Sequence, residues 1–256
     1  MLNYGANARY NARMVRLRPA LACLAFVLAV GSAVAALLGG LGYRLDWWAL
    51  GQGFWMVRWA AYTALGGAGA GVLALIVPPL RGQLAARATA CAAVVIAAGV
   101  LAPPWLAQQL AEGAPAINDI TTDFENAPAF VAIVPLRAGS NNPPDYPGAE
   151  FAQRQRQSFP DIAPAHLSAP PAEAFTRARA AAAAMGWNIV AVAPDEGRIE
   201  ATAETRWFGL KDDVVIRVRP EGNGTRVDIR SKSRIGRGDR GMNAWRVREF
   251  LRRLNG

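Results

Sequence analysis

Three long stretches without a charged side chain lie within the first 110 residues, and they limit the fold more than any other feature. They cover residues 19–42, 59–80 and 88–106. A helix rises about 1.5 Å per residue and the hydrocarbon core of a bilayer is about 30 Å thick, so each stretch can cross a membrane as a helix. The chain is 52% hydrophobic and only 18% charged, below the roughly one quarter charged residues of soluble domains. The sequence therefore predicts a three-helix transmembrane anchor over residues 1–110.

Two details of the first two stretches leave alternatives open. Ala33-Val-Ala35 resembles the cleavage site of a secretory signal, but residues 19–42 exceed the usual apolar length of about 7–15 residues, so a retained span is favoured. The small residues 66–71 predict close packing of helices, either within one chain, which we favour, or between two chains. In the third stretch, Pro103 and Pro104 predict a kink or an end of the helix.

The distribution of arginine around the spans predicts the orientation of the chain. Four arginines precede the first span and two lie in the second loop, whereas the first loop holds two (Arg9, Arg13, Arg16 and Arg18; Arg81 and Arg87; Arg44 and Arg58). The segment after the third span begins with acidic residues such as Glu112 and has no basic residue before Arg137. The positive-inside rule then predicts a cytoplasmic N-terminus and a C-terminal half across the membrane. An aromatic belt is expected at the outer boundary, formed by Tyr43, Trp47, Trp48, Trp55 and Trp59.

Residues 111–168 differ in composition from both of their neighbours. They are rich in proline and carry more acidic than basic side chains. We expect an extended linker that packs on the next domain through its aromatic residues, with 130–134 as its only strand-like run. The single histidine, His166, lies in this segment and is interpreted as a loop residue, because no serine or cysteine motif accompanies it.

Residues 169–256 show the regular patterns of a small α+β domain. Helical periodicity covers 171–185 and 242–254, and alternation of apolar and polar side chains predicts four strands between them, over 188–193, 198–207, 213–219 and 225–235. Short turns join the strands, so the sheet is expected to be antiparallel. The predicted fold class is α+β: three N-terminal transmembrane helices followed by an α-β-β-β-β-α antiparallel sheet domain, with both helices on one face.

The last predicted strand places its basic side chains on one face, because successive side chains of a strand point to opposite sides. With neighbouring arginines they form a candidate anion-binding set of Arg217, Arg219, Arg230, Lys232, Arg234 and Arg246. Residues expected to support this set are Asp212, Asp213, Ser231, Ser233, Asp239 and Asn243. The alternative is a solvated sheet face, on which arginines pair with Glu200, Glu204 and Asp228.

Four segments of the second half carry a resemblance to a known family. They are 117–123, 209–219, 226–236 and 239–246, and the most specific is Arg230-Ser-Lys-Ser-Arg234 followed by Gly236-x-x-Asp239. Together they resemble the signature of a domain-of-unknown-function family, number 1499, over about residues 115–254. Its members occur in bacteria and in chloroplast-targeted plant proteins, sometimes behind transmembrane helices, and the resemblance implies no established activity. With the spans, it implies a multi-pass protein of the bacterial inner membrane whose C-terminal domain is periplasmic.

Two classes of function then compete. The favoured one is a membrane-anchored binding or scaffold module whose arginine-bearing face recognises a lipid head group, another anionic ligand or an acidic protein partner. The alternative is an enzyme that uses Asp212 or Asp213 with Ser231 or Ser233. Adjacent aspartates of a strand point to opposite faces and neither serine has an evident base, so hydrogen bonds that hold the strand are the favoured role of the aspartates.

Other chemistry is disfavoured by residue types that are scarce. Nucleic-acid binding needs a cytoplasmic domain and aromatic residues among the basic ones, and the basic strand lacks them. A single histidine excludes a histidine-cluster metal site, and the only thiols, Cys23 and Cys91, lie within the spans. We therefore predict no cofactor, no metal ligand and no catalytic residue.

Overall fold

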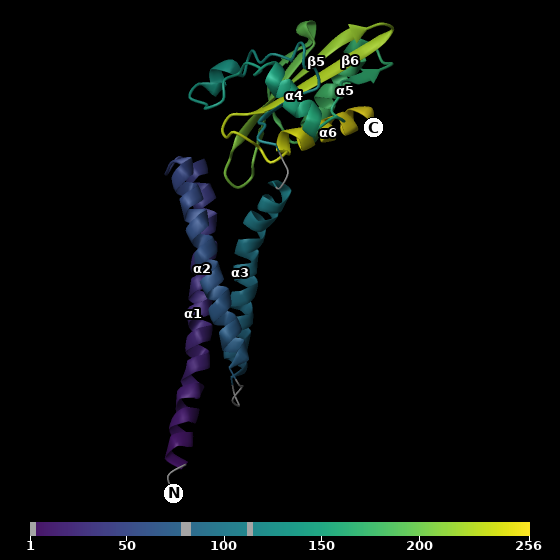
Figure 1. Cartoon of the computed structure of the whole chain (residues 1–256). Helices are drawn as coiled ribbons and strands as arrows, with labels where there is room; N and C mark the ends of the chain where they lie inside the picture. The colour runs from purple at the N-terminus through teal and green to yellow at the C-terminus, as the bar shows by residue number, and fades with distance from the viewer. Residues whose placement is uncertain (1–3, 78–82, 112–114) are drawn as a thin grey trace. The chain divides into compact units, whose positions relative to one another are not determined.

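The computed structural model describes residues 4–77, 83–111 and 115–256 (Figure 1). It contains two compact units, Met1–Gln109 with Trp207–Gly209, and Leu110–Arg206 with Leu210–Gly256. Arg81 and Glu112, which entered the charge comparison above, lie outside the described residues.

The first unit consists of three long helices, α1 (Tyr4–Arg44), α2 (Leu50–Ile76) and α3 (Leu84–Ala111). Each contains a segment long and apolar enough to cross a membrane, namely Leu17–Arg44, Leu50–Ile76 and Leu84–Gln109, which confirms the three predicted candidate spans. Helices α2 and α3 begin before the predicted stretches, because helical hydrogen bonding continues through Arg58 and Arg87 although their charges interrupt the apolar run. The prolines at 103 and 104 do not end α3.

Small residues form the contact between these helices. The buried cluster consists of Ala25, Ala29, Ala64, Ala93 and Ala97. A Cβ atom at Gly67 would lie 3.2 Å from the carbonyl oxygen of Ala25, and one at Gly71 would lie 2.8 Å from Val94 Cγ2, whereas one at Gly66 would meet nothing. Close packing within the chain therefore uses Gly67 and Gly71 of α2.

The side chain of Arg18 caps the C-terminal end of α2. Its buried guanidinium donates hydrogen bonds to the carbonyl oxygens of Ala74 (2.9 Å) and Val77 (2.5 Å). The last carbonyls of a helix have no partner within the helix, and a cation near them is favourable. This flanking arginine thus has a structural role besides its charge.

The second unit is built on an antiparallel sheet in the order β1-β6-β5-β4-β3, with β2 also paired to β6. The elements are β1 (Asp119–Thr121), η1 (Val134–Arg137), α4 (Ala149–Ser158), β2 (Ala165–Leu167), α5 (Pro171–Ala184), β3 (Asn188–Ala193), η2 (Pro194–Glu196), β4 (Arg198–Glu204), β5 (Lys211–Glu221), β6 (Gly224–Ser233) and α6 (Met242–Asn255). The predicted order α-β-β-β-β-α is confirmed by α5, β3 to β6 and α6.

The segment before residue 169 is more structured than a linker. It supplies β1 and β2, which both pair with β6 on the side away from β5, and it supplies α4. The strand expected over 130–134 is wrong: residues 130–133 form a loop, and η1 begins at Val134. Strands of three residues are too short to show alternation in the sequence. They form because the free edge of β6 offers unpaired hydrogen-bonding groups.

One face of the sheet packs on helices α5 and α6, as predicted (Figure 1). Alternate residues of β4, β5 and β6 point into this core, among them Ile199, Ile216 and Ile229. From α6, Phe250 enters the core and stacks on Trp187 at a centroid distance of 5.9 Å.

The opposite face is also covered. Phe130 and Ile133 from the loop before η1 pack on Val215 of β5. The backbone N–H groups of Val131, Ala132 and Ile133 donate to the buried carboxylate of Glu200 at 2.9–3.1 Å. The basic face of β6 is therefore largely covered and is not a solvated face, although the arginine pairs with Glu200 and Asp228 that the alternative expected are present.

Candidate functional site

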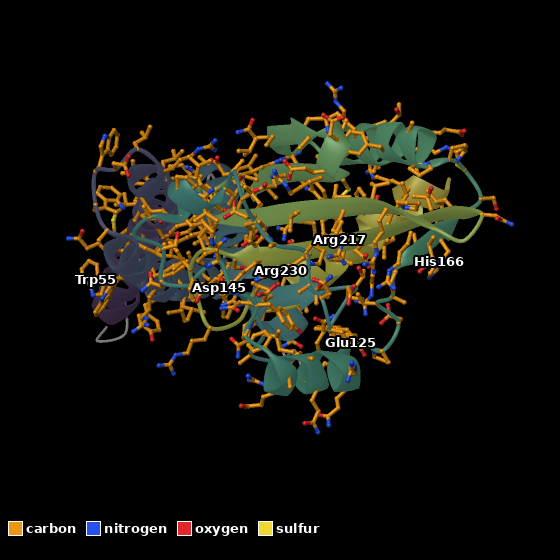
Figure 2. The ribbon with its side chains drawn as sticks, turned by 90° about the horizontal axis from the view of Figure 1, so that it is seen from above. Trp55, Glu125, Asp145, His166, Arg217 and Arg230 are labelled. Atoms are coloured by element: carbon orange, nitrogen blue, oxygen red, sulfur yellow. The ribbon has the colours of Figure 1, made fainter. Side chains whose placement is uncertain are left out.

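The arginine face is the set of charged side chains between the sheet and the segment 115–148. Antiparallel pairing of β5 and β6 sets Arg217 opposite Asp228, and Asp213 opposite Lys232. Figure 2 shows Arg217 and Arg230 over the sheet. The face divides into three groups of basic side chains, each arranged around buried carboxylates.

Asp119 of β1 is the centre of the first group. Arg230 binds it at two points, with Nε 2.9 Å from Oδ1 and Nη2 2.8 Å from Oδ2. Lys232 Nζ lies 3.0 Å from Oδ2 and also donates to the carbonyl oxygen of Asp145. Burial lowers the pKa of Lys232, although the charge of Asp119 opposes this effect. Both basic side chains are 2% exposed, so neither is open to a ligand.

Asp213 of β5 is the centre of the second group. Arg234 binds it at two points, both 2.8 Å, and Arg137 Nη1 lies 2.6 Å from Oδ2. Arg137 also donates to the carbonyl oxygens of Asn142 and Ser233 and thereby holds the chain after η1 on the sheet. Burial lowers the pKa of Arg137, and Asp213 opposes the shift.

The third group is the most accessible. Arg217, Arg219 and Arg226 surround Asp123 and Asp228, with the nearest N–O distances between 2.9 and 3.2 Å. Burial raises the pKa of Asp123, but the N–H of Asn126 and the charges of Arg226 and Arg217 outweigh it, so this pKa lies below its ordinary value. Arg219 keeps 37% of its side chain exposed.

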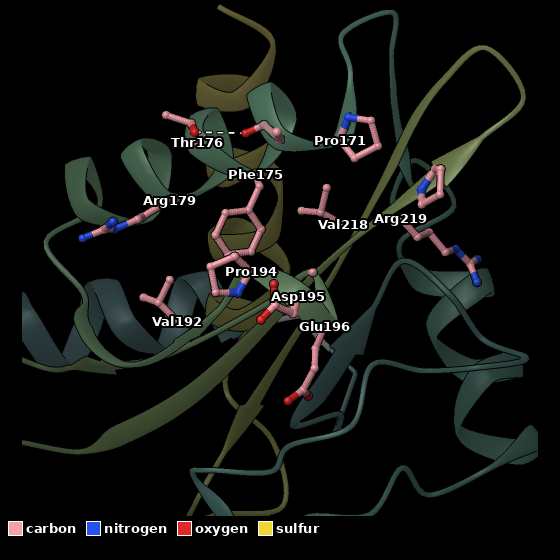
Figure 3. Close-up of a pocket in the computed structure, with 13 residues that line it drawn as sticks. Pro171, Phe175, Thr176, Arg179, Val192, Pro194, Asp195, Glu196, Val218 and Arg219 are labelled. Carbon is pink, nitrogen blue, oxygen red and sulfur yellow. Dashed lines mark hydrogen bonds between the residues drawn. The ribbon is translucent and has the colours of Figure 1, made fainter.

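Two cavities border this third group. The larger, about 720 Å³, has an apolar wall that includes Phe175, Pro194 and Val218, with Arg219 at its edge (Figure 3). The smaller, about 260 Å³, is lined by Asn126, Arg198 and Arg217 among others. The buried Nε atom of Arg217 has no hydrogen-bond partner within the described residues.

A second polar network lies on the helix face at the end of β6. Asn243 of α6 accepts from Ser231 Oγ (2.6 Å) and donates to Ser233 Oγ (2.9 Å). Arg246 donates to Ser231 Oγ (3.0 Å) and to Asp212 (2.7 Å). The network thus brings together five of the residues singled out from the sequence.

Asp239 lies beside this network, at the start of α6. It accepts from the N–H groups of Gly241 and Asn243, and burial raises its pKa. Asp212 and Asp213 point to opposite faces, as predicted from their adjacency, and each holds an arginine.

This network gives the serines no general base. The hydroxyl proton of Ser231 points to an amide oxygen, and its other partner is a guanidinium, which does not accept a proton. Within the described residues, no contact joins a carboxylate or an imidazole to either Ser231 or Ser233. His166 is exposed and lies 2.5 Å from Glu221. The part of the chain that the structure describes holds no group of metal-ligating side chains.

The sequence interpretation missed the partners that complete the arginine face. Asp119, Asp123 and Arg137 belong to the segment interpreted as a linker, yet they contact residues 76 to 111 positions away. The signal that could have indicated them was the acidic segment 117–123, set against an excess of arginine later in the chain.

Comparison with known proteins agrees with the resemblance noted above. A family model described as "Protein of unknown function (DUF1499)" matches residues 119–254, from β1 to the end of α6. No curated protein and no solved structure matches the chain. Because the match covers more than half of the sequence and includes every carboxylate of the arginine face, the protein belongs to the DUF1499 family.

Proposed function

We propose that this membrane-anchored DUF1499 protein is a binding module whose C-terminal domain lies across the membrane from the N-terminus and takes an anionic ligand beside Arg219. The orientation rests on the arginines that flank the first span and the second loop. Trp47 and Trp48, and likewise Trp55 and Trp59, form neighbouring ring pairs around the connection of α1 and α2, which suits a boundary between bilayer and water there.

The accessibility of the third group, beside two cavities, is the observation on which the ligand proposal depends. Three guanidiniums share the buried carboxylates of Asp123 and Asp228, and Arg226 has a further, more distant partner in the exposed Glu221 at 3.9 Å. Arg219 is accessible, and Arg217, whose buried Nε has no hydrogen-bond partner in the described part of the chain, lines the smaller cavity. Arginine presents several donors in a plane, which suits phosphate and carboxylate groups.

The other members of the predicted set are proposed to stabilise the domain. Arg230, Lys232, Arg234 and Arg246 are buried or nearly so, and each has a carboxylate partner. Charge reversal at Arg230 or Arg234 would therefore break the fold and would not report on binding. Of the predicted set, only Arg217 and Arg219 remain in the proposed site. Arg226, which was not in that set, joins them.

Thermal unfolding of the full chain in detergent micelles tests the ligand proposal, with inorganic phosphate titrated against chloride at constant ionic strength. A ligand of the folded state raises the melting temperature, and we expect phosphate to do so. Arg219→Gln should abolish the rise, whereas the exposed Arg154→Gln should retain it. An equal rise in the wild type and in Arg219→Gln would refute the site.

A reporter fused after Gly256 tests the orientation separately. We expect a reporter that needs export to be active and a cytosolic fluorescent reporter to be dark. The opposite pattern would place the C-terminal domain in the cytoplasm and overturn the proposed topology.

A further inference from the structure

The loop 236–241 and the first turn of α6 expose basic and apolar side chains together. Arg237 and Arg240 are exposed and form no ion pair within the described residues, while Met242 and Trp245 are 45% and 54% exposed. The one acid in the loop, Asp239, points inward and accepts from backbone N–H groups at the start of α6. The outer surface of this loop, which we name the basic–aromatic end, is therefore positive and partly apolar.

The basic–aromatic end is hydrogen-bonded to residues 117 and 118, where the chain enters the domain. Asn118 Nδ2 donates to the carbonyl oxygen of Gly236 (2.6 Å), and the N–H of Asp239 donates to that of Ile117 (3.3 Å). A Cβ atom at Gly238 would lie 3.1 Å from Ala116 Cα, so the two segments run in close contact. The loop 236–241 and residues 116–118 are therefore fixed to one another and share one position.

The chain between the third candidate span and this point is short. The span ends at Gln109, and Ile117 follows eight residues later. A chain of that length extends at most about 28 Å. The covalent tether therefore allows the basic–aromatic end to reach the lipid head groups at the end of the span.

We infer that the basic–aromatic end docks on the surface of an anionic bilayer, through Arg237 and Arg240 with Met242 and Trp245. Arginine near an anionic surface is attracted to it, and tryptophan favours the boundary between head groups and acyl chains. The contact uses none of the residues of the proposed anion site, so it stands or fails independently of Arg217, Arg219 and Arg226.

A depth measurement on the full chain tests this docking. In a Cys23→Ala, Cys91→Ala background, Met242→Cys is labelled with an environment-sensitive fluorophore, and the protein is placed in nanodiscs of phosphatidylcholine with phosphatidylglycerol that contain a spin-labelled quenching lipid. The matched control is the same label at Asn223→Cys, in the turn between β5 and β6 at the other end of the sheet. Trp245→Cys provides a second labelling position if the label at 242 disturbs α6.

We expect strong quenching at position 242 and little at 223. The double variant Arg237→Glu, Arg240→Glu should reduce the quenching at 242 to the level at 223 and leave the melting temperature unchanged, because both arginines are exposed and unpaired in the described structure. Equal quenching at 242 and 223, or quenching at 242 that survives both charge reversals, would overturn the inference.

Discussion

Arg230 of β6 and Asp119 of β1 form a two-point ion pair that joins the segment behind the membrane spans to the long strands of the sheet. The Asp119 side chain is fully buried, and Lys232 approaches the same carboxylate to 3.0 Å. Phe130 covers the pair from the loop side, with its ring centroid 4.9 Å from the Arg230 guanidinium. A buried cation is costly without its partner, so this pair is expected to determine whether β1 stays on the sheet.

Asp119→Asn should strongly destabilise the domain. It leaves Arg230 and Lys232 buried without a carboxylate, a change that typically costs about 3–5 kcal/mol. Chemical unfolding of the full chain in detergent micelles measures the effect. The exposed pair of Glu150 and Arg154 supplies the control, since Glu150→Gln should cost less than about 1 kcal/mol. A loss as small as that of the control would contradict a structural role for Asp119.

Asp212→Asn separates the structural from the enzymatic interpretation of the helix-face network. We expect a marked drop in melting temperature, because Arg246 would remain buried beside a neutral amide. In the otherwise wild-type chain, the conservative variant Arg246→Lys should not keep the wild-type melting temperature. A lysine cannot reach Ser231, Asn243 and Asp212 with separate fixed donors. An unchanged melting temperature in Asp212→Asn would argue against the structural role.

Tyr146→Phe should be neutral or stabilising at pH 7. The Tyr146 hydroxyl is buried without a hydrogen-bond partner in the described part of the chain, so its removal relieves a desolvation cost. Burial and the charge of Asp119 raise the pKa of Tyr146 to about 12, from 10.0. The folded state thus keeps this proton while the unfolded chain loses it, and stability should fall as pH rises from 10.0 to about 12. Unfolding followed against pH should show a weaker fall in Tyr146→Phe; identical pH profiles would contradict the assignment.

Asp123 should contribute stability at neutral pH that is lost in acid. Its pKa is lower in the folded state, so the contribution is present above the unfolded pKa of about 4 and disappears as pH falls through the folded value. Asp123→Asn should therefore melt below the wild type at pH 7, and the difference should close at low pH. A difference in melting temperature that stays constant across this pH range would show that the charge of Asp123 does not contribute to stability.

Gly71→Leu should lower the stability of the three-helix unit, whereas Gly66→Leu should not. The two glycines lie on one helix, but only Gly71 faces a close neighbour, Val94 on α3. Forcing a larger side chain into such a contact typically costs about 1–3 kcal/mol. Unfolding of the anchor in mixed micelles, followed by helical circular dichroism, compares the two variants. Equal effects would mean that Gly71 does not pack within the chain.

Features that repeat along the chain were predictable without a structure. The three spans follow from the length of apolar runs, and the order of α5, β3 to β6 and α6 follows from periodicities of 3.6 and 2. Even the opposite directions of Asp212 and Asp213 follow from adjacency on a strand. The DUF1499 resemblance rested on the same segments that the family model matches.

The partners of the arginine face were not predictable in this way. Periodicity places Arg217 and Arg230 on one side of the sheet, but it does not say what lies above them. Asp119 comes 111 positions before Arg230, and its strand of three residues has no pattern of its own. Because the basic side chains were counted without the covering segment, their face was interpreted as exposed.

By itself, the sequence determined the three candidate membrane spans, the α+β class and the side of the sheet that bears the arginines, because each depends on local repetition of side-chain type. Only the tertiary structure decided that most of those arginines are buried in ion pairs and that Arg219 stays accessible. The physical reason is that burying a charge is favourable only where another part of the chain brings a counter-charge or hydrogen-bond partners, and such long-range pairing leaves no local pattern.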